Sequence, residues 1–518
     1  MTTLNRRNFM KASSAAIGML ALPGCVARPL TVRSPYGSGI PEQEAGTAVN
    51  DVHSQLNATR VGAIMKPRNV EALQVAIARA KSAGQTISIA GGRHAMGGQQ
   101  FGEATLLIDT RDMNQVLAFD NERGSITVEG GIQWPQLIEY LNRTQDGRDR
   151  QWGIVQKQTG ADRLSIAGAL SCNAHGRGLN LKPIVDQVEA FDLIDHTGEI
   201  RTCSRSSHRD LFRLAIGGYG LFGIISRVEL KLRPRVKVRR IVALGETATI
   251  MERFEERIRD GYLYGDYQFA TDSSRDSFLR RGVFSCYGPV PLETPLTPDP
   301  TRFRPEDWAR LTFYSHKYKR RAFEVYSSRY LKTSGQVYWA DWQLSAAYVD
   351  DYHADLDRAL HAKVKATEMI TEIYVPRAAL TAFMDGARAG LRARKANVIY
   401  GTVRLIEQDD ETFLAWARER YACVIFNLHV EHTPQAIERA ADAFRELIDF
   451  GIRHGGSYYL TYHRWARRDQ VERCYPQMAE FLELKRRHDP AETFQSTWYR
   501  HYRTMFGVGS VGVPGARL

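Results

Sequence analysis

The spacing of apolar residues divides the chain into two folded stretches that meet near Pro234. Before that point, short apolar runs such as Leu106–Ile108 predict buried strands, and Asn69 precedes apolar positions at helical spacing that end at Gly84. Beyond it, the segments are longer and amphipathic and carry many aromatic residues. The pattern therefore predicts two successive regions in which helices and strands are mixed.

Residues 1–27 have a different pattern, which is typical of a secretory signal. A basic head, Asn5–Lys11, precedes an apolar run that Pro23-Gly24 interrupts before it is long enough to span a bilayer. The pair Arg6-Arg7 within this head resembles a twin-arginine leader, which exports proteins already folded. We therefore expect an exported, periplasmic protein.

The end of this leader and the segment after it predict how the protein is released. Cys25 resembles the lipidated residue of a bacterial lipobox, and cleavage after Ala27 is the alternative. Residues 28–55 are rich in proline, glycine and serine and are predicted to be a tether. A lipid on Cys25 is the only membrane contact that we expect.

Composition excludes several classes of protein. The 518 residues are 43% hydrophobic, which is enough for a large core, and six cysteines without a C-x-x-C pair disfavour disulfide scaffolds and zinc ribbons. The net charge of +12 is diffuse, and the basic stretches at 231–240 and 485–488 lack the interleaved aromatics of nucleic-acid sites. We expect no nucleic-acid partner.

One glycine motif points to a dinucleotide fold that its surroundings contradict. Gly218–Gly223 satisfies G-x-G-x-x-G, but a Rossmann site needs a strand before this motif and a helix after it. Here Arg209–Ile216 has helical spacing and precedes the motif, whereas Ile224–Leu232 alternates as a strand and follows it. The reversed order argues against a Rossmann site.

Two further loops of small residues interrupt the same region. The loop Gly91–Gln99 follows a predicted strand and embeds His94, and the stretch Thr159–Gly176 combines glycines with hydroxyl groups. Either loop by itself is also compatible with a tight turn or a packing seam. Together, the three loops indicate a long phosphate-containing cofactor, because glycine-rich backbone approaches anions closely.

These motifs resemble the three signatures of the FAD-binding domain of the vanillyl-alcohol oxidase/p-cresol methylhydroxylase (PCMH) flavoproteins. The matching segments are Gly91–His94 with Gly97–Gln99, Ser165–Gly168 with Ala174–Gly176, and Gly217–Ile225. The resemblance implies an α+β fold, with a PCMH-type FAD-binding domain of two α+β subdomains at residues 56–238. It also implies an α+β substrate (cap) domain with an antiparallel sheet at 239–468 and a C-terminal segment at 469–518 that returns to the FAD domain.

The resemblance also implies how FAD is bound. In the family, the first loop wraps the pyrophosphate and its histidine is often bonded to the flavin, so His94 is expected to carry a covalent bond. Arg163 and Leu164 stand where doubly linked members carry a cysteine, so a second bond is not expected. The residues that the resemblance assigns to the cofactor are Gly91, Gly92, Arg93, His94, Ala95, Gly98, Gln99, Ser165, Gly168, Ser171, His175, Gly223, Ile224 and Trp498.

Candidate catalytic residues come from the second region. The predicted strand 397–404 ends in Arg404 and resembles the strand that brings an arginine to the flavin in sugar-lactone and alditol oxidases. Those relatives usually have a glutamate two residues earlier, where this chain has Thr402, and this departure puts a polyol or lactone substrate in doubt. A surface position at the end of the strand is the alternative for Arg404.

Two further segments supply His429, Tyr462 and His463. His429 is predicted to face the substrate, and a surface histidine is the alternative. A metal site on His429–His432 would need a third ligand that the sequence does not reveal, and we expect no metal. Tyr462 and His463 lie in the polar and aromatic segment 458–465, and Tyr462 with Trp498 is expected to contact the flavin. Core packing is the alternative for both aromatics.

The leading hypothesis is an exported FAD-dependent oxidoreductase that takes hydride from a CH–OH group of a small molecule such as a sugar, a sugar lactone or an alcohol. Oxygen or another acceptor would then take the electrons. Two alternatives stay open: a flavin-dependent reductase of C=C bonds, and a flavin-binding electron carrier without turnover. The absence of G-x-S-x-G disfavours a hydrolase.

Overall fold

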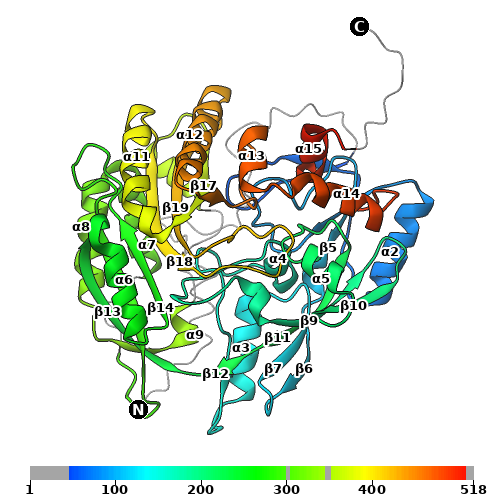
Figure 1. Ribbon diagram of the computed structural model, residues 1–518, viewed down its shortest axis with the longest axis horizontal. Coiled ribbons are helices and arrows are strands. Elements are labelled where there is room, and N and C mark those ends of the chain that lie inside the picture. The colour runs from blue at the N-terminus through cyan, green and yellow to red at the C-terminus, as the bar shows by residue number, and fades with distance from the viewer. Residues whose placement is uncertain (1–45, 299–303, 345–351, 509–518) are drawn as a thin grey trace, which may run out of the picture.

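The computed structural model describes residues 46–298, 304–344 and 352–508. The predicted leader with Cys25, and the predicted tether up to residue 45, lie outside this part of the chain. In Figure 1 a large sheet with its helices lies on the left, two smaller sheets lie on the right, and the helices of the C-terminal segment lie at the upper right. The predicted α+β fold is confirmed.

The first small sheet is parallel and belongs to a strand–helix–strand unit. Its order is β3-β5-β4, formed by Ala63–Met65, Leu106–Asp109 and Ile87–Ala90. Helix α2, Val70–Ser82, connects β3 to β4 across the sheet. Asn69 begins this helix as predicted, because its Oδ1 accepts a hydrogen bond of 2.9 Å from Ala72 N.

The second small sheet is antiparallel and has five strands in the order β10-β9-β11-β7-β6. Their bounds are Ile200–Ser204, Val188–Ile194, Ile224–Lys231, Ser125–Glu129 and Val116–Asp120. Helices α3, Trp134–Thr144, α4, Ile166–Ser171, and α5, Arg209–Ala215, accompany it. Since α5 precedes the G-x-G-x-x-G motif and β11 follows it, the argument against a Rossmann site is confirmed.

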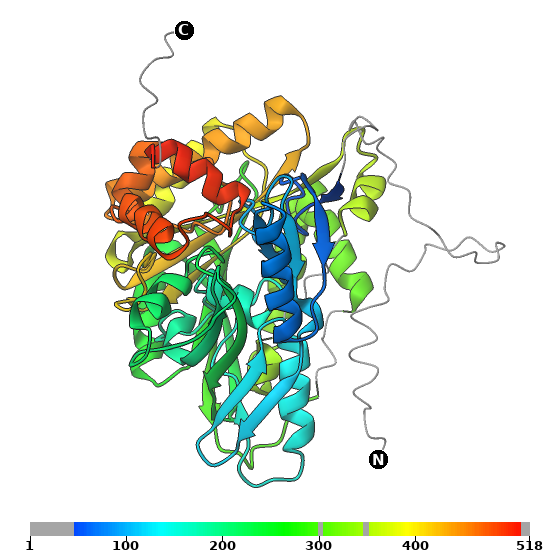
Figure 2. The ribbon, with the colours of Figure 1, turned by 90° about the vertical axis from the view of Figure 1, so that its right-hand side faces the viewer.

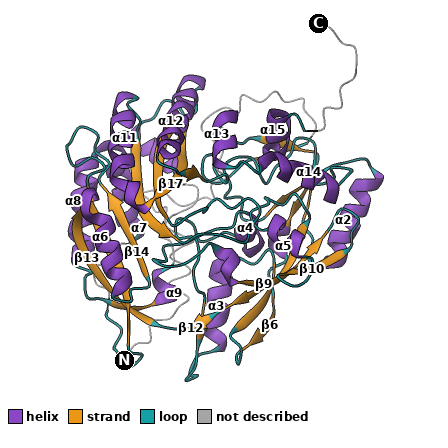
Figure 3. Ribbon diagram, in the orientation of Figure 1, coloured by secondary structure: helices purple, strands orange, loops and turns teal. Residues whose placement is uncertain are grey.

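The large antiparallel sheet has eight strands in the order β16-β13-β15-β14-β18-β19-β17-β20. The bounds are Val337–Trp339, Lys237–Glu246, Arg281–Val290, Tyr264–Phe269, Val398–Ile406, Tyr421–Glu431, Ala366–Pro376 and Ser457–Tyr458. Helices α6, Ile250–Arg259, α11, Leu380–Ala393, and α12, Pro434–Arg453, pack on one face, which is apolar (Figure 3).

The opposite face of the large sheet is unusually polar and carries the candidate chemistry. Because alternate residues of a strand share a face, Glu368 and Glu372 of β17 point to the same side as His429 of β19 and Arg404 of β18. Helices α7, Pro305–Lys317, α8, Lys319–Leu331, and α10, His353–Leu360, pack against the sheet by this face. Polar groups buried between layers need partners, so this face is the place to look for a site.

The C-terminal segment contains more structure than its sequence pattern predicts. The pattern predicts a helix over 476–487, followed after Asp489-Pro490 by an irregular terminus. The structure has α13, Arg468–Cys474, and α14, Met478–His488, and Thr497–Phe506 also form a helix, α15. The pattern does not reveal α15 because its buried side consists of the aromatics Trp498, Tyr499 and Tyr502 rather than an aliphatic stripe. Figure 2 shows these last helices beside the N-terminal strands and α2.

The predicted tether is folded at its end. Strand β1, Thr47–Val49, pairs with β2, Thr59–Val61, and Asp51, His53 and Ser54 are buried. Asp51 organises this segment by accepting hydrogen bonds from the backbone N–H groups of His53 and Ser54. The folded part of the chain therefore begins before residue 56.

The remaining elements are short: β8, Trp152–Gly153, which pairs with β12, Arg233–Pro234, and α9, Ala340–Gln343. Among the described residues, every helix is too short or too polar to cross a bilayer.

Candidate flavin and substrate site

The first glycine-rich loop, residues 91–99, is packed between two other segments by its backbone. A Cβ atom on Gly91 would lie 2.0 Å from Ser165 Oγ, and a Cβ atom on Gly97 would lie 2.4 Å from the carbonyl oxygen of Tyr462. Only glycine fits such positions, because the backbone itself is the packing surface. The loop brings the second glycine motif and the C-terminal part of the chain together.

Hydrogen bonds attach the same loop to the C-terminal segment. Gly98 has a φ of +74°, and its carbonyl oxygen accepts from Trp498 N at 3.2 Å. The side chain of Gln99 donates to the carbonyl oxygen of Leu460 at 2.7 Å. The C-terminal end of the loop is thus held by residues far away in the sequence.

The other residues of this loop that were predicted to bind the cofactor contact neighbouring residues of the protein. Arg93 has a left-handed φ of +61°, and its guanidinium lies 3.2 Å from the buried carboxylate of Asp109. A Cβ atom on Gly92 would lie 2.2 Å from a backbone carbonyl oxygen of the segment before the second motif. Ala95 accepts a hydrogen bond of 2.7 Å from the side chain of Gln100 through its carbonyl oxygen.

His94 is paired with a second histidine. Its Nδ1 lies 2.8 Å from Nε2 of His53, and its Nε2 is buried without a hydrogen-bond partner among the described residues. Burial lowers the pKa of His94 well below its ordinary value and lowers the pKa of His53 to about 4. Both rings are therefore neutral at pH 7, and one proton lies between them. When the shared proton sits on Nδ1 of His94, its Nε2 carries a lone pair and can act as a nucleophile.

The second and third motifs meet behind this loop. Ser165 begins α4 and accepts a hydrogen bond of 3.3 Å from Gly168 N, and the carbonyl oxygen of Ser171 accepts from Tyr219 N at 2.9 Å. Gly223 has a φ of +151°, and a Cβ atom there would lie 2.5 Å from a carbonyl oxygen of β9. Ile224 follows it, fully buried, as the first residue of β11.

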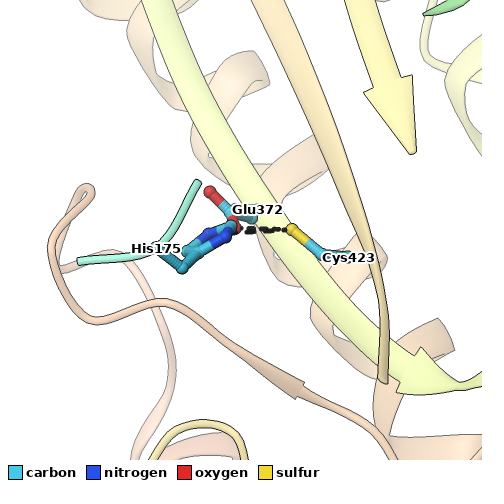
Figure 4. Close-up of side chains that lie close together, drawn as sticks. All are labelled: His175, Glu372 and Cys423. Carbon is cyan, nitrogen blue, oxygen red and sulfur yellow. Dashed lines mark hydrogen bonds and ion pairs between the residues drawn. The ribbon is translucent and has the colours of Figure 1, made fainter. Parts of the chain in front are cut away.

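A buried carboxylate, Glu372, stands at the centre of a second group of residues (Figure 4). Its Oε1 lies 2.5 Å from Nε2 of His175 and accepts from Cys423 Sγ at 2.6 Å and from the Tyr374 hydroxyl at 3.0 Å. Its Oε2 accepts from the Tyr462 hydroxyl at 3.1 Å. Burial would raise the pKa of Glu372, but these donors together with the charge of Arg404 lower it to about 2. The carboxylate is therefore ionised at neutral pH.

Arg404 is part of this group and is not a surface residue. It is 6% exposed, and its Nε is buried without a hydrogen-bond partner among the described residues. It lies opposite Cys423 in the strand ladder, on the face that carries Glu372. The pKa of the buried Lys157 is lowered mainly by burial, and the charge of Arg404 lowers it further. The site thus holds an unpaired guanidinium beside an ionised glutamate.

The sequence did not point to Glu372, although it showed that Thr402 stands where the relatives usually have a glutamate. Glu372 and Thr402 both pair with Ile425 of the strand between them, so they lie in one cross-strand row. Two strand spacings separate them, which is about 10 Å. A signal was present: Glu368 and Glu372 are two carboxylates at strand spacing in an otherwise buried segment, Ala366–Pro376.

The four predicted catalytic residues do not gather at one place. Arg404 and Tyr462 belong to the Glu372 group, whereas the Nδ1 of His429 lies 3.9 Å from the carboxylate of Glu368. His463 stacks on Trp465 with ring centroids 4.1 Å apart, and burial lowers its pKa to about 4 against the charge of Asp51.

Trp498, which was predicted to contact the flavin, is completely buried. Its ring lies 4.9 Å from that of Tyr219 in the third motif, and its Nε1 has no hydrogen-bond partner among the described residues. Trp498 therefore links the first and third motifs from the C-terminal side.

Comparisons with known proteins agree with this architecture. The chain is 24% identical to L-gulono-1,4-lactone dehydrogenase of Mycobacterium tuberculosis over 444 residues, which is 85% of this chain and 95% of that protein. It is 24% identical to bovine (Bos taurus) L-gulonolactone oxidase over 195 residues, covering 38% of this chain and 42% of the relative. It is 26% identical to D-arabinono-1,4-lactone oxidase of Yarrowia lipolytica over 181 residues, covering 34% of this chain and 33% of the relative.

A family description of FAD binding domains matches residues 61–204. The protein is an FAD-dependent oxidoreductase. The matched range of this oxidoreductase contains the first two glycine motifs, β3 to β10 and α2 to α4. The polar face with Glu372 and Arg404 lies outside it, on the sheet formed by the second half of the chain.

The residues around the three motifs fit FAD on two independent observations. The first loop has no room for side chains at Gly91 and Gly97, and glycine backbone of this kind can approach a pyrophosphate closely. The buried polar atoms His94 Nε2, Trp498 Nε1 and Arg404 Nε lack partners among the described residues. Buried polar atoms normally have partners, and a large polar cofactor supplies them.

Proposed function

We propose that this oxidoreductase removes hydride from a CH–OH group of a small sugar lactone or a related sugar alcohol. The observation that carries the proposal is the buried Arg404, whose Nε is unpaired among the described residues, beside the ionised Glu372. Three relatives named for sugar lactones support the substrate class, and one of them is matched over 95% of its length. Thr402 no longer argues against such a substrate, because Glu372 supplies a carboxylate in the same cross-strand row.

FAD, when bound, supplies the hydride acceptor, and the protein supplies charge and proton handling. The backbone around Gly91, Gly97 and Gly98 would hold the pyrophosphate, and His94 would hold the flavin end. Arg404 places positive charge where negative charge develops during the reaction, and its burial strengthens the effect.

Tyr462 and Glu372 form a route for the hydroxyl proton. The Tyr462 hydroxyl donates to Glu372 Oε2, so the lone pairs of its oxygen can accept a hydrogen bond from the substrate hydroxyl. As the hydride leaves carbon, the hydroxyl proton passes to the Tyr462 oxygen, and the Tyr462 proton passes to Glu372. The alcohol thereby loses one hydride and one proton and becomes a carbonyl compound.

A substrate panel tests the proposal directly. Under anaerobic conditions, the FAD-loaded enzyme is mixed with 1,4-lactones, alditols, free sugars and aromatic alcohols, and the flavin absorbance is followed. We expect bleaching by members of the first two groups. Bleaching by a nicotinamide donor alone would assign a reductase instead, and absence of bleaching by every compound would assign an electron carrier. Oxygen uptake compared with reduction of a dye then identifies the electron acceptor.

We further propose that His94 is bonded covalently to the flavin. Support comes from its neutral, buried ring, which His53 orients by a hydrogen bond at Nδ1 and whose Nε2 is unpaired among the described residues. Acid-denatured wild-type protein should retain yellow, fluorescent flavin, and His94→Ala should release it. The exposed His361→Asn should behave as wild type. Release of all flavin from the wild type would contradict the bond.

We also propose that the protein is exported to the periplasm by its twin-arginine leader. Arg6, Arg7 and the short apolar run after them support this proposal. Changing Arg6-Arg7 to Lys-Lys should leave the protein in the cytoplasmic fraction, and cell fractionation with detection of the protein checks it. Replacement of Cys25 by Ser should release exported protein from membranes if this cysteine is lipidated.

A further inference from the structure

A second cluster of ligand-type side chains lies on the same polar face, four residues along β17 from Glu372. Its centre is Glu368, whose Oε1 lies 2.9 Å from Nε2 of His316 on α7 and 3.9 Å from Nδ1 of His429 on β19. Its Oε2 lies 3.3 Å from Nδ1 of His353 on α10 and accepts a hydrogen bond from Tyr352. Three of these side chains are almost fully buried, with 2% exposure for His316, 1% for Glu368 and 3% for His353.

The hydrogen bonds of His316 leave its second ring nitrogen as an acceptor that faces another acceptor, and a cation between the two would stabilise them. Its Nδ1 lies 2.8 Å from the carbonyl oxygen of Thr312, which can only accept, so Nδ1 carries hydrogen. In the neutral ring Nε2 is then an acceptor, yet it faces a carboxylate oxygen at 2.9 Å. Two acceptors approach this closely only when a proton or a metal ion lies between them. A histidine that donates one nitrogen to a backbone carbonyl is the usual arrangement of a metal ligand.

His429 supports the metal alternative. Its Nδ1 is buried without a hydrogen-bond partner among the described residues, although it points to the same oxygen of Glu368. Its ring is perpendicular to that of His316, with centroids 4.8 Å apart. The ligand atoms of His316, Glu368 and His429 all lie within 4.8 Å of one another. Ligands of a tetrahedral zinc ion lie about 3.4 Å apart, so these side chains must move closer together around a bound ion.

The charge around Glu368 also suits a cation, in contrast to the Glu372 group. Among the described residues, the ion-pair partners of Glu368 are histidines only. Glu372 instead has hydrogen bonds from Cys423, Tyr374 and Tyr462, and the charge of Arg404 acts on it. An arginine so close repels a metal ion, whereas the groups around Glu368 are histidines and the Tyr352 hydroxyl.

We propose that His316, Glu368 and His429 bind one divalent transition-metal ion. Imidazole nitrogens with one carboxylate suit zinc and the other divalent first-row metals. The ion ties together α7, β17 and β19, three elements that are separate in the sequence. It lies about 13 Å along β17 from Glu372, so it is distinct from the proposed reaction centre.

The cluster also lies close to the proposed attachment point of the flavin. The charges of Glu368 and His353 affect the pKa of His53, and His53 is hydrogen-bonded to His94. The metal would therefore hold in place the residues next to His53, which contacts the flavin loop through His94. The sequence did not reveal this site because His432, the neighbour of His429, bonds Thr367 instead and the other ligands come from distant segments.

Metal content tests the proposal on the full-length, FAD-loaded protein without a histidine tag. After incubation with zinc and desalting, wild type should retain about one zinc ion per chain, measured by inductively coupled plasma mass spectrometry. Glu368→Gln and His429→Asn should each lower the retained zinc at least tenfold. The flavin spectrum shows whether each variant is folded, and His429→Asn is the milder change if Glu368→Gln does not fold.

Glu372→Gln is the matched control, because it removes a buried glutamate of the same strand and face. It should retain zinc as wild type does. Three results would overturn the proposal: wild type without stoichiometric zinc, Glu368→Gln with as much zinc as wild type, or loss of zinc in Glu372→Gln alone. The first of these would assign a shared proton, rather than a metal, to the His316–Glu368 pair.

Discussion

Glu372 is ionised in a place where burial alone would make it neutral. Its charge is maintained by groups from three other segments: His175 of the second motif, Cys423 of β19 and Tyr462 of the loop that packs on Gly97. Arranging donors around a buried charge costs free energy, so such groups are concentrated at functional sites. At the scale of single residues, Glu372 and Arg404 are therefore the pair on which function depends most.

Glu372→Gln should impair both activity and the acid dependence of stability. The amide cannot take the proton from Tyr462, so kcat should fall about 10²–10⁴-fold. The pKa of Glu372 is about 2 in the folded protein and has an ordinary value of 4.5. A lowered pKa contributes stability above the ordinary value, and this contribution is lost as pH falls through 2.

Urea unfolding between pH 6 and pH 2 measures this contribution. Wild type should lose stability over this range more steeply than Glu372→Gln. The exposed Glu431→Gln, on the next strand of the same sheet, should follow wild type. Parallel curves for wild type and Glu372→Gln would show that Glu372 is not held ionised by the fold.

Arg404→Met should lower kcat/KM about 10²–10³-fold, because it removes positive charge from a buried site. Arg404→Lys should recover part of the loss, since a lysine keeps the charge but not the planar donors. Steady-state kinetics with the best substrate of the panel check this. Arg239→Lys, an exposed position on β13, serves as the control. Equal activity of Met and Lys variants would exclude a role for the charge.

At the scale of elements, the C-terminal segment acts as a clamp on the first loop. The backbone of residues 493–498 hydrogen-bonds to Ile87, Phe101 and Gly98, and the carbonyl oxygen of Tyr462 packs on Gly97. The conformation of the first loop therefore depends in part on residues that the chain places more than 300 positions later.

Gly97→Ala should test this clamp. The new Cβ would lie 2.4 Å from the carbonyl oxygen of Tyr462, so the loop and the segment must move apart. We expect FAD content to fall at least tenfold relative to wild type, measured by the ratio of flavin to protein absorbance. In Gly153→Ala the nearest atom is 3.6 Å away, so this control should keep its FAD. Full FAD content in Gly97→Ala would mean that the clamp is dispensable.

At the scale of the whole molecule, the second glycine motif is attached to the substrate domain by a buried polar contact. The carboxylate of Asp409 accepts from the side chain of Asn173 at 2.8 Å, and the carbonyl oxygen of Asn173 accepts from Trp416 Nε1 at 3.1 Å. Asp409 also accepts from the backbone of the turn that follows it. These bonds fix the distance between the FAD-binding half and the face that carries Arg404.

Asp409→Ala should lower the free energy of unfolding by about 2–3 kcal/mol, because buried donors lose a charged acceptor. Its neighbour provides a matched control: Asp410 also forms a contact between the two halves, with Lys182 at 2.6 Å, but its side chain is 64% exposed. Exposed pairs contribute about 0–1 kcal/mol, so Asp410→Ala should change little. Denaturant unfolding of both variants checks this, and equal effects would contradict the assignment.

The sequence by itself determined the local elements and the cofactor. Helix α2 with its cap at Asn69, the helix-before-strand order around Gly218–Gly223 and the three glycine loops depend on neighbouring residues. These elements can therefore be recognised from the spacing of residues along the chain. The three loops indicated a phosphate-containing cofactor, and their resemblance to the PCMH flavoproteins implied FAD and an α+β fold. The match of residues 61–204 to FAD binding domains confirms the cofactor.

Only the tertiary structure decided which polar residues act together. Arg404, Cys423 and Glu372 lie on three different strands, and His316, Glu368 and His429 join a helix to two strands. These groupings follow from strand register, which couples residues far apart in the sequence and leaves no local pattern. The same register separates His429 from Arg404, although both were predicted for one site, because their side chains occupy different rows of the sheet.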